Sequence, residues 1–149
     1  MNEIRIIEAG LDELEPAAKL FDAYRQFYGR PSDMAACRAY LRERLAHGDS
    51  RVYLACREGR FEGFMQLYPS FGSLSLRRTW ILYDLFVTPE ARGKGVATRL
   101  LGQARQLGLD TGAHDLTLST AITNLKAQSL YERMGWKRDQ EFHYYNLTI

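Results

Sequence analysis

Residues 81–101 constrain the fold more than any other stretch of the chain. A run of β-branched, aromatic and aliphatic residues, Ile81 to Val87, ends at Pro89, and a basic turn containing Gly93 and Gly95 follows it. After the turn, apolar positions recur at helical spacing. The order strand, glycine-rich turn and helix N-terminus leaves free backbone N–H groups where an anion can approach them. The sequence therefore predicts an α/β arrangement with a site for an anionic, pyrophosphate-bearing ligand.

Two common phosphate-binding patterns do not fit this turn. A Walker-type loop requires Gly-x-x-x-x-Gly-Lys-Ser/Thr, but Lys94 is followed by a glycine. A dinucleotide fingerprint requires a glycine or alanine where Thr98 stands. The next predicted strand, 116–120, also ends without the acid that would bind a ribose. The first pattern is excluded and the second is disfavoured.

Two motifs in the second half of the chain together resemble the GNAT superfamily of N-acetyltransferases. The first is Arg/Gln-x-x-Gly-x-Gly/Ala, which is matched by Arg92, Gly95 and Ala97. The second begins at Asn124, a good helix N-cap, and reaches Tyr131 seven residues later, before a glycine and an aromatic residue. The resemblance covers the whole chain. It implies an α/β (α+β) fold with a mixed central sheet of six to seven strands and about four helices, whose splayed strands form an acetyl-CoA cleft.

Acetyl-CoA is the cofactor and co-substrate that the resemblance implies. The strand backbone would bind the pantetheine arm, the turn would bind the pyrophosphate, and Asn124 would bind the pantetheine or order the loop beneath it. The implied cofactor-binding residues are Leu85, Phe86, Val87, Arg92, Gly93, Lys94, Gly95, Val96, Ala97, Thr98, Asn124 and Tyr131. No metal site is expected, because the histidines and cysteines are scattered without ligand-like spacing.

Tyr131 is the first predicted catalytic residue. By the resemblance, its phenol would lie near the cofactor sulfur and protonate the thiolate that leaves when an amine attacks the thioester. The alternative is a tyrosine that packs its helix on the sheet. Both interpretations are open at the level of the sequence.

Asp84 is the second predicted catalytic residue, as a base. Many relatives place a glutamate where this chain has Tyr83, and strand alternation would put Tyr83 and Asp84 on opposite faces unless a bulge re-aims one of them. Asp84 could act through water, Tyr83 could only orient the amine, or Glu62 on the preceding strand could be the base. Asp84 could instead be a structural acid paired with Arg77 or Arg78.

Aromatic side chains are the predicted acceptor-binding residues. Tyr28, Tyr83 and Phe71 could contact the apolar stem of an amine or its cation, although aromatics on the first helix could equally be core residues. Asp22 and Asp33 could attract a cationic substrate. The nearest resemblance within the superfamily is to small acetyltransferases of polyamines, histone-type peptides and amino compounds. It implies transfer to a primary amine of a small molecule or peptide, in a homodimer; an aminoalkylphosphonate acceptor is also possible.

Composition limits the other functions of the chain. The 149 residues form one predicted domain, 1–149, with a net charge of +2 and no basic tail, which disfavours nucleic-acid binding. No run approaches the roughly 20 apolar residues of a membrane span. Two cysteines without a signal-peptide pattern indicate a reduced, cytoplasmic protein. The alternative to an enzyme is a non-catalytic CoA-binding sensor or interaction module, which Tyr131 argues against and the missing glutamate at position 83 favours mildly.

The predicted elements follow the order of the superfamily. They are a strand at 3–8, helices at 12–28 and 31–47, strands at 51–57, 61–68 and 79–87, a helix within 89–109, a strand at 116–120, a helix at 125–134, and one or two strands within 136–149.

Overall fold

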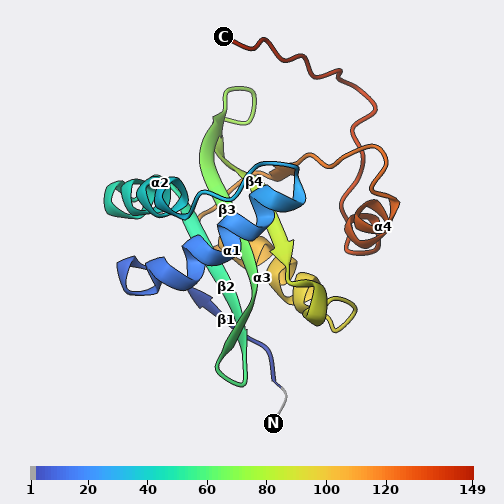
Figure 1. Ribbon diagram of the computed structural model, residues 1–149. Helices are drawn as coiled ribbons and strands as arrows, with labels where there is room; N and C mark the ends of the chain where they lie inside the picture. Colours follow the sequence, from blue (N-terminus) through green and yellow to red (C-terminus); the bar gives the residue numbers. More distant parts are fainter. Residues whose placement is uncertain (1–2) are drawn as a thin grey trace. The chain divides into compact units, whose positions relative to one another are not determined.

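The computed structural model describes residues 3–149 (Figure 1). The chain divides into two compact units, one ending at Leu118 and one beginning at Ser119. The N-terminal unit contains the sheet and three of the α-helices, and the C-terminal unit contains the fourth. No α-helix within residues 3–149 is long and apolar enough to cross a membrane.

The N-terminal unit is built on a five-stranded mixed sheet in the order β1-β2-β3-β4-β5. The strands are β1 (Arg5–Glu8), β2 (Arg51–Arg57), β3 (Arg60–Gly72), β4 (Arg77–Val87) and β5 (Leu116–Leu118). The first four are antiparallel neighbours, and β5 pairs parallel to β4 after a crossover through α3 (Val96–Asp110). The predicted mixed α/β fold is confirmed, with fewer strands than the six to seven expected.

The missing strands are those predicted within residues 136–149. This segment has no strand in the described structure, and its backbone instead forms a local turn around Asp139. The Asp139 carboxylate accepts hydrogen bonds from the backbone N–H groups of Glu141 and Phe142 and from the Tyr144 hydroxyl. An aspartate that satisfies nearby backbone donors competes with a strand ladder, so the strands predicted within 136–149 do not form.

Two helices lie between β1 and β2 in the chain, as predicted. α1 (Leu14–Phe27) follows a short 3₁₀ turn, η1 (Leu11–Glu13), so it begins two residues later than the expected start at Asp12. α2 (Met34–His47) is capped by Asp33, whose side chain accepts a hydrogen bond from the Ala36 N–H at 3.0 Å. It ends at Gly48, which has a φ of 65°. A glycine is favoured there because left-handed backbone is costly for other residues.

The core of the unit has helices on both faces of the sheet. α1 and α2 lie across one face (Figure 1), where Phe21 and Leu41 join Phe64 of β3 in one buried cluster. The preceding residue, Gly63, points the other way, and a Cβ placed there would lie 2.8 Å from Val96 of α3. Gly63 therefore allows α3 to pack closely on the opposite face.

Candidate active site

A β-bulge lies between β3 and β4 at the predicted base. Gln66 is opposite Asp84, but the next pair is Leu67 opposite Leu82, so Tyr83 is an extra residue on β4. A bulge re-aims the side chains beside it. The Tyr83 ring packs against the ring of Tyr68 on β3, with 5.6 Å between the ring centroids. The Asp84 carboxylate accepts a hydrogen bond from Gln66, which is also on β3. The bulge thus directs both Tyr83 and Asp84 to the face covered by α1 and α2.

Asp84 is a buried carboxylate with polar partners and no arginine or lysine partner among them. It is 3% exposed, and the Gln66 side-chain amide donates to its Oδ2 at 2.8 Å. Burial raises the pKa of Asp84 to about 6, against the lowering effect of hydrogen bonds from Gln66 and Tyr24. The same Tyr24 hydroxyl, from α1, lies 3.3 Å from the backbone oxygen of Tyr83.

The alternative interpretation of Asp84, as the partner of Arg77 or Arg78, is wrong. The guanidinium of Arg77 donates to the backbone carbonyls of Gly112 and Ala113. The guanidinium of Arg78 lies over the rings of Phe71 and Trp80, at 5.3 Å from each ring centroid. Asp84 therefore keeps an unneutralised carboxyl group in a buried environment.

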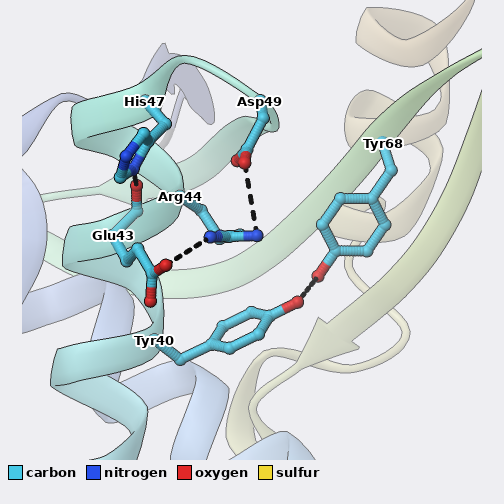
Figure 2. A network of polar contacts seen from close by, with 6 residues as sticks. All are labelled: Tyr40, Glu43, Arg44, His47, Asp49 and Tyr68. Carbon is cyan, nitrogen blue, oxygen red and sulfur yellow. Dashed lines mark hydrogen bonds and ion pairs between the residues drawn. The ribbon is translucent and has the colours of Figure 1, made fainter.

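Tyrosines surround this carboxyl group. Tyr24 packs against Tyr28 with 5.0 Å between ring centroids, and Tyr83 packs against Tyr68. Figure 2 shows the hydroxyls of Tyr68 and Tyr40 pointing at each other, 2.6 Å apart, which joins β3 to α2. Burial and the Tyr40 hydrogen bond raise the pKa of Tyr68 well above its usual range, so its phenol is neutral at physiological pH.

Arg44 anchors the α2 side of this tyrosine cluster. Its guanidinium lies 5.5 Å from the centroid of the Tyr40 ring and forms ion pairs with Asp49 at 3.2 Å and Glu43 at 3.1 Å (Figure 2). Its charge is therefore balanced by two acids. The cluster adds little net positive charge beside Asp84.

The three predicted acceptor-binding residues lie in different places. Tyr83 and Tyr28 belong to the tyrosine cluster and are 66% and 51% exposed, so both can contact a ligand. Phe71 is 75% exposed near the end of β3, about 10 Å of strand beyond Tyr68, and packs beside Arg78. The structure thus brings together two of the three.

The predicted phosphate turn has the backbone that such a site needs. Gly93 and Gly95 have φ values of 74° and 85°, and a Cβ built on either would meet no atom within 4 Å. Gly95 is the N-cap of α3 and supplies no side-chain cap. The N–H groups of residues 96–98 in the first helical turn have no intrahelical partner and carry the positive end of the helix dipole.

The side chain of Arg92 turns back toward the end of β4. Its Nε donates to the backbone oxygen of Val87 at 3.1 Å, and its guanidinium lies over the rings of Phe27 and Phe86. Phe86 is itself buried. Any cofactor contact from Phe86 would therefore come from its backbone, while the Arg92 side chain fixes the start of the turn.

β4 extends beyond its last partner in β5. The parallel pairing covers only Trp80 to Leu82, and β4 continues for five more residues to Val87. Within the N-terminal unit, no described strand pairs with this edge of residues 83–87. This is the strand edge at which the pantetheine arm was predicted to bind.

The two predicted site residues of the C-terminal unit lie on or next to α4 (Leu125–Arg133). Asn124 caps the helix, since its Oδ1 accepts a hydrogen bond from the Ala127 N–H at 3.2 Å. Tyr131 lies in the last turn, and its ring centroid is 6.2 Å from that of Trp136. The helix predicted at 125–134 is confirmed within one residue.

Two other acids that were considered at the sequence level have structural partners. Glu62 forms a largely buried ion pair with Arg57 at 2.8 Å, on the lining of a pocket of about 310 Å³. Asp22 accepts hydrogen bonds from Ser32, from the Asp33 N–H and from Gln26, and so fastens the end of α1 to the start of α2. Both acids are engaged away from the tyrosine cluster. Among the described residues, no group of three or more histidine, cysteine or acidic side chains could hold a metal.

Sequence analysis missed Gln66 and Tyr40. Tyr40 was predicted only as part of a helix, since a single aromatic on a helix rarely indicates a site. Gln66 gave a usable signal, because a glutamine within the apolar run Phe64 to Leu67 has no packing reason to be there.

Comparisons with known proteins show the family of this chain. The model of the acetyltransferase (GNAT) family matches residues 17–136. An uncharacterized N-acetyltransferase, YhfO of Bacillus subtilis (strain 168), is 42% identical over 146 residues, covering 98% of each chain. A crystal structure of a probable acetyltransferase is 46% identical and covers 97% of each chain with a TM-score of 0.93.

A more distant structure supports the fold alone. The aminoglycoside N-acetyltransferase AAC(6')-Iy in complex with CoA has a TM-score of 0.81 at 20% identity, covering all of this chain and 97% of the other. Because the family match spans most of the chain and the 42% identical relative spans nearly all of it, the protein belongs to the acetyltransferase (GNAT) family and is an N-acetyltransferase.

Proposed function

We propose that this N-acetyltransferase transfers the acetyl group of acetyl-CoA directly to a primary amine of a small molecule or peptide, with Asp84 as the general base. One observation carries the proposal. Asp84 is a buried carboxyl group with a pKa raised to about 6, it lies at a bulge among partly exposed tyrosines, and it is eight residues before the turn at Arg92 on the same stretch of chain.

The residues of the turn fit a diphosphate. Gly93 and Gly95 have positive φ, a conformation that is strained for other residues, and the space beside them is open. The first turn of α3 offers N–H donors to an anion. We assign pyrophosphate binding to the backbone of residues 93–98 and pantetheine binding to the β4 edge at residues 85–87. Bound acetyl-CoA would supply an acetyl group already activated as a thioester.

The protein must take a proton from the acceptor before transfer. An alkylammonium group has a pKa of about 10.4, whereas an ordinary aspartate has one of about 3.9, a mismatch of roughly 6.5 units. The raised pKa of Asp84 reduces this mismatch by about 2 units, or about 3 kcal/mol of the proton-transfer free energy. Above pH 6 the carboxylate is still mostly ionised and can accept the proton directly or through one water.

The tyrosine cluster suits an acceptor with a cationic amine. Tyr28, Tyr40 and Tyr83 are exposed members of this cluster, and an ammonium over an exposed aromatic face gains about 0.5–1 kcal/mol. The balanced charge of Arg44 leaves the carboxylate as the local attraction for a cation. This supports a polyamine-like or other small amine over an acidic acceptor.

The complete transfer forms an amide N–C bond and breaks the C–S bond of the thioester. The ammonium loses one proton to Asp84 before it attacks, and the nitrogen loses a second proton as the tetrahedral intermediate collapses to the amide. The departing thiolate gains a proton from a phenol, and the second proton of the nitrogen returns through solvent to that phenol. We assign this phenol to Tyr131, as the family resemblance implies, with acceptor and acetyl-CoA bound together. Asn124 would support the cofactor from the same helix, while it also caps that helix.

A thiol-release assay with acetyl-CoA tests the proposal. The acceptor panel would contain spermidine, kanamycin, phenethylamine and a lysine-containing peptide, and mass spectrometry would detect an added acetyl group. We expect release of CoA and one acetylated amine. Tight CoA binding with no acetylation of any amine would instead indicate a CoA-binding sensor, and absence of CoA binding would refute the proposal entirely.

We also propose a homodimer, on the family resemblance. Light scattering of the purified protein, at concentrations from micromolar upward, would give twice the 17.2 kDa chain mass. A mass of one chain throughout would refute the dimer without affecting the proposed chemistry.

A further inference from the structure

Gln66 is a buried polar residue that packing does not explain. Its side chain is fully buried in the middle of β3, beside Met65 and Leu67, which are also fully buried. Its Oε1 has no hydrogen-bond partner among the described residues. A buried amide with an unsatisfied atom destabilises a fold, so a methionine or leucine would be expected at such a position unless the amide has another role.

Within residues 3–149, the hydrogen bond of the Gln66 side chain is with Asp84. Its Nε2 donates to Oδ2 of Asp84 at 2.8 Å, and the two residues are register partners across β3 and β4. The register changes immediately after this pair, where Tyr83 is the extra residue. The contact therefore joins two backbone positions that the sheet already holds together, directly beside the bulge.

We propose that Gln66 is a positioning residue for Asp84, an inference that rests on the proposed role of Asp84 as base. The amide holds one carboxylate oxygen, which fixes the plane of the carboxyl group and leaves the other oxygen for the acceptor. A neutral donor also stabilises the ionised form of Asp84 without adding a charge that would repel an ammonium group. Gln66 thereby keeps the base ionised at neutral pH despite its burial.

The neighbouring titratable groups do not obscure the titration of Asp84. Tyr24 from α1 and Tyr68 from β3 have pKa values raised far above the physiological range, so both stay neutral. From α2, Tyr40 is bonded to Tyr68, Arg44 is paired with two acids, and His47 is bonded to the backbone oxygen of Glu43 (Figure 2). β5 contributes no titratable side chain.

The test is the titration of the Asp84 carboxyl carbon by ¹³C NMR in wild type and Gln66→Met, with the signal assigned by its loss in Asp84→Asn. A hydrogen bond to a charged group is worth about 1.5–3 kcal/mol, which converts to a rise of about 1–2 pH units in the midpoint. The acidic limb of the kcat/KM profile, measured with the best amine of the acceptor panel, should move by the same amount. CoA affinity should not change.

Gln26→Met is the matched control. Gln26 donates to the Asp22 carboxylate at 3.0 Å, so this variant removes the same kind of bond from a different buried acid and should leave the Asp84 titration in place. Gln66→Glu is a second variant, with a like charge that should raise the Asp84 midpoint still further. If Gln66→Met does not fold, the Asp84 midpoint is measured in Gln66→Glu instead.

The outcomes separate the two proposals. An unshifted Asp84 midpoint in a folded Gln66 variant overturns the positioning role, while Asp84 can still be the base. A shifted midpoint with an unshifted kcat/KM limb shows that Asp84 is not the base, which overturns the proposed function and the catalytic meaning of Gln66 together.

Discussion

Asp84→Asn should make the protein more stable and much less active. The raised pKa means that the folded state holds the Asp84 proton more tightly than the unfolded chain does. Its favourable contribution is complete below the unfolded pKa, near 3.8, and is lost as the pH rises through the folded pKa, near 6. At pH 8 the ionised group costs the full difference of about 2.2 pKa units, or about 3 kcal/mol of the free energy of unfolding.

The pH dependence is the sharper part of this prediction. From the two pKa values, the cost of ionised Asp84 is about 3 kcal/mol at pH 8 and about 1.6 kcal/mol at pH 5. The stability difference between Asp84→Asn and wild type should therefore fall by about 1.4 kcal/mol over this range. The fall does not depend on how well the asparagine amide bonds to Gln66 and Tyr24, because those contacts do not titrate.

Urea unfolding followed by circular dichroism at pH 5, 6, 7 and 8 measures this difference, and Asp22→Asn is its control. Burial raises the pKa of Asp22, but hydrogen bonds from Ser32, the Asp33 N–H and Cys37 outweigh it and hold the pKa below its usual range. Its stabilising contribution is present above the unfolded pKa, so Asp22→Asn should destabilise the fold at pH 8.

Activity supplies the second half of the test. Loss of a general base lowers turnover by about 10²–10⁴-fold, so Asp84→Asn should retain CoA binding but little transfer. A stability difference that is constant from pH 5 to pH 8 would refute the raised pKa. Wild-type turnover in Asp84→Asn would refute the catalytic role even if the stability prediction held.

Three further substitutions test other parts of the protein. Gly95→Asp should weaken CoA binding by at least about 100-fold, measured by calorimetry, because it adds a negative charge at the phosphate turn and strains a φ of 85°; unchanged affinity would refute the assigned turn. Tyr131→Phe should lower turnover by roughly 10²-fold with CoA affinity kept, and unchanged turnover would assign Tyr131 to packing. Gly63→Ala should destabilise the fold by about 1–3 kcal/mol in urea unfolding, because the new Cβ would lie 2.8 Å from Val96 and 3.0 Å from Leu100; a wild-type midpoint would show that α3 can move away.

Local chemistry made most of the fold predictable. Asp33 and Gly48 mark the two ends of α2, and Glu58 with Gly59 marks the turn between β2 and β3, where both residues have positive φ. Each of these signals acts within a few residues, so it does not depend on contacts with distant parts of the chain. The phosphate turn was predictable for the same reason, because glycines at positions 93 and 95 indicate a backbone with positive φ.

Contacts between strands were not predictable in this way. Regular alternation separates Tyr83 from Asp84, and the extra residue that reverses this appears only when β3 and β4 are paired. The contact of Gln66 with Asp84 depends on the same register. For the terminal segment the error was the opposite one, since strands were predicted within 136–149 where the side chain of Asp139 forms a local turn.

The bulge also accounts for how this chain could work without a glutamate at position 83. With one extra residue in β4, the side chain after Tyr83 turns to the face of α1 and α2, where an acid one position later can reach the same surroundings. The Asp84 side chain is shorter than that of a glutamate and only 3% exposed, and this burial raises its pKa. Hydrogen bonds from Gln66 and Tyr24 oppose that rise. On this argument the roles of Asp84, the bulge and Gln66 depend on one another. The double variant Tyr83→Glu, Asp84→Asn, which puts the acid at position 83, should therefore be less active than the wild-type protein.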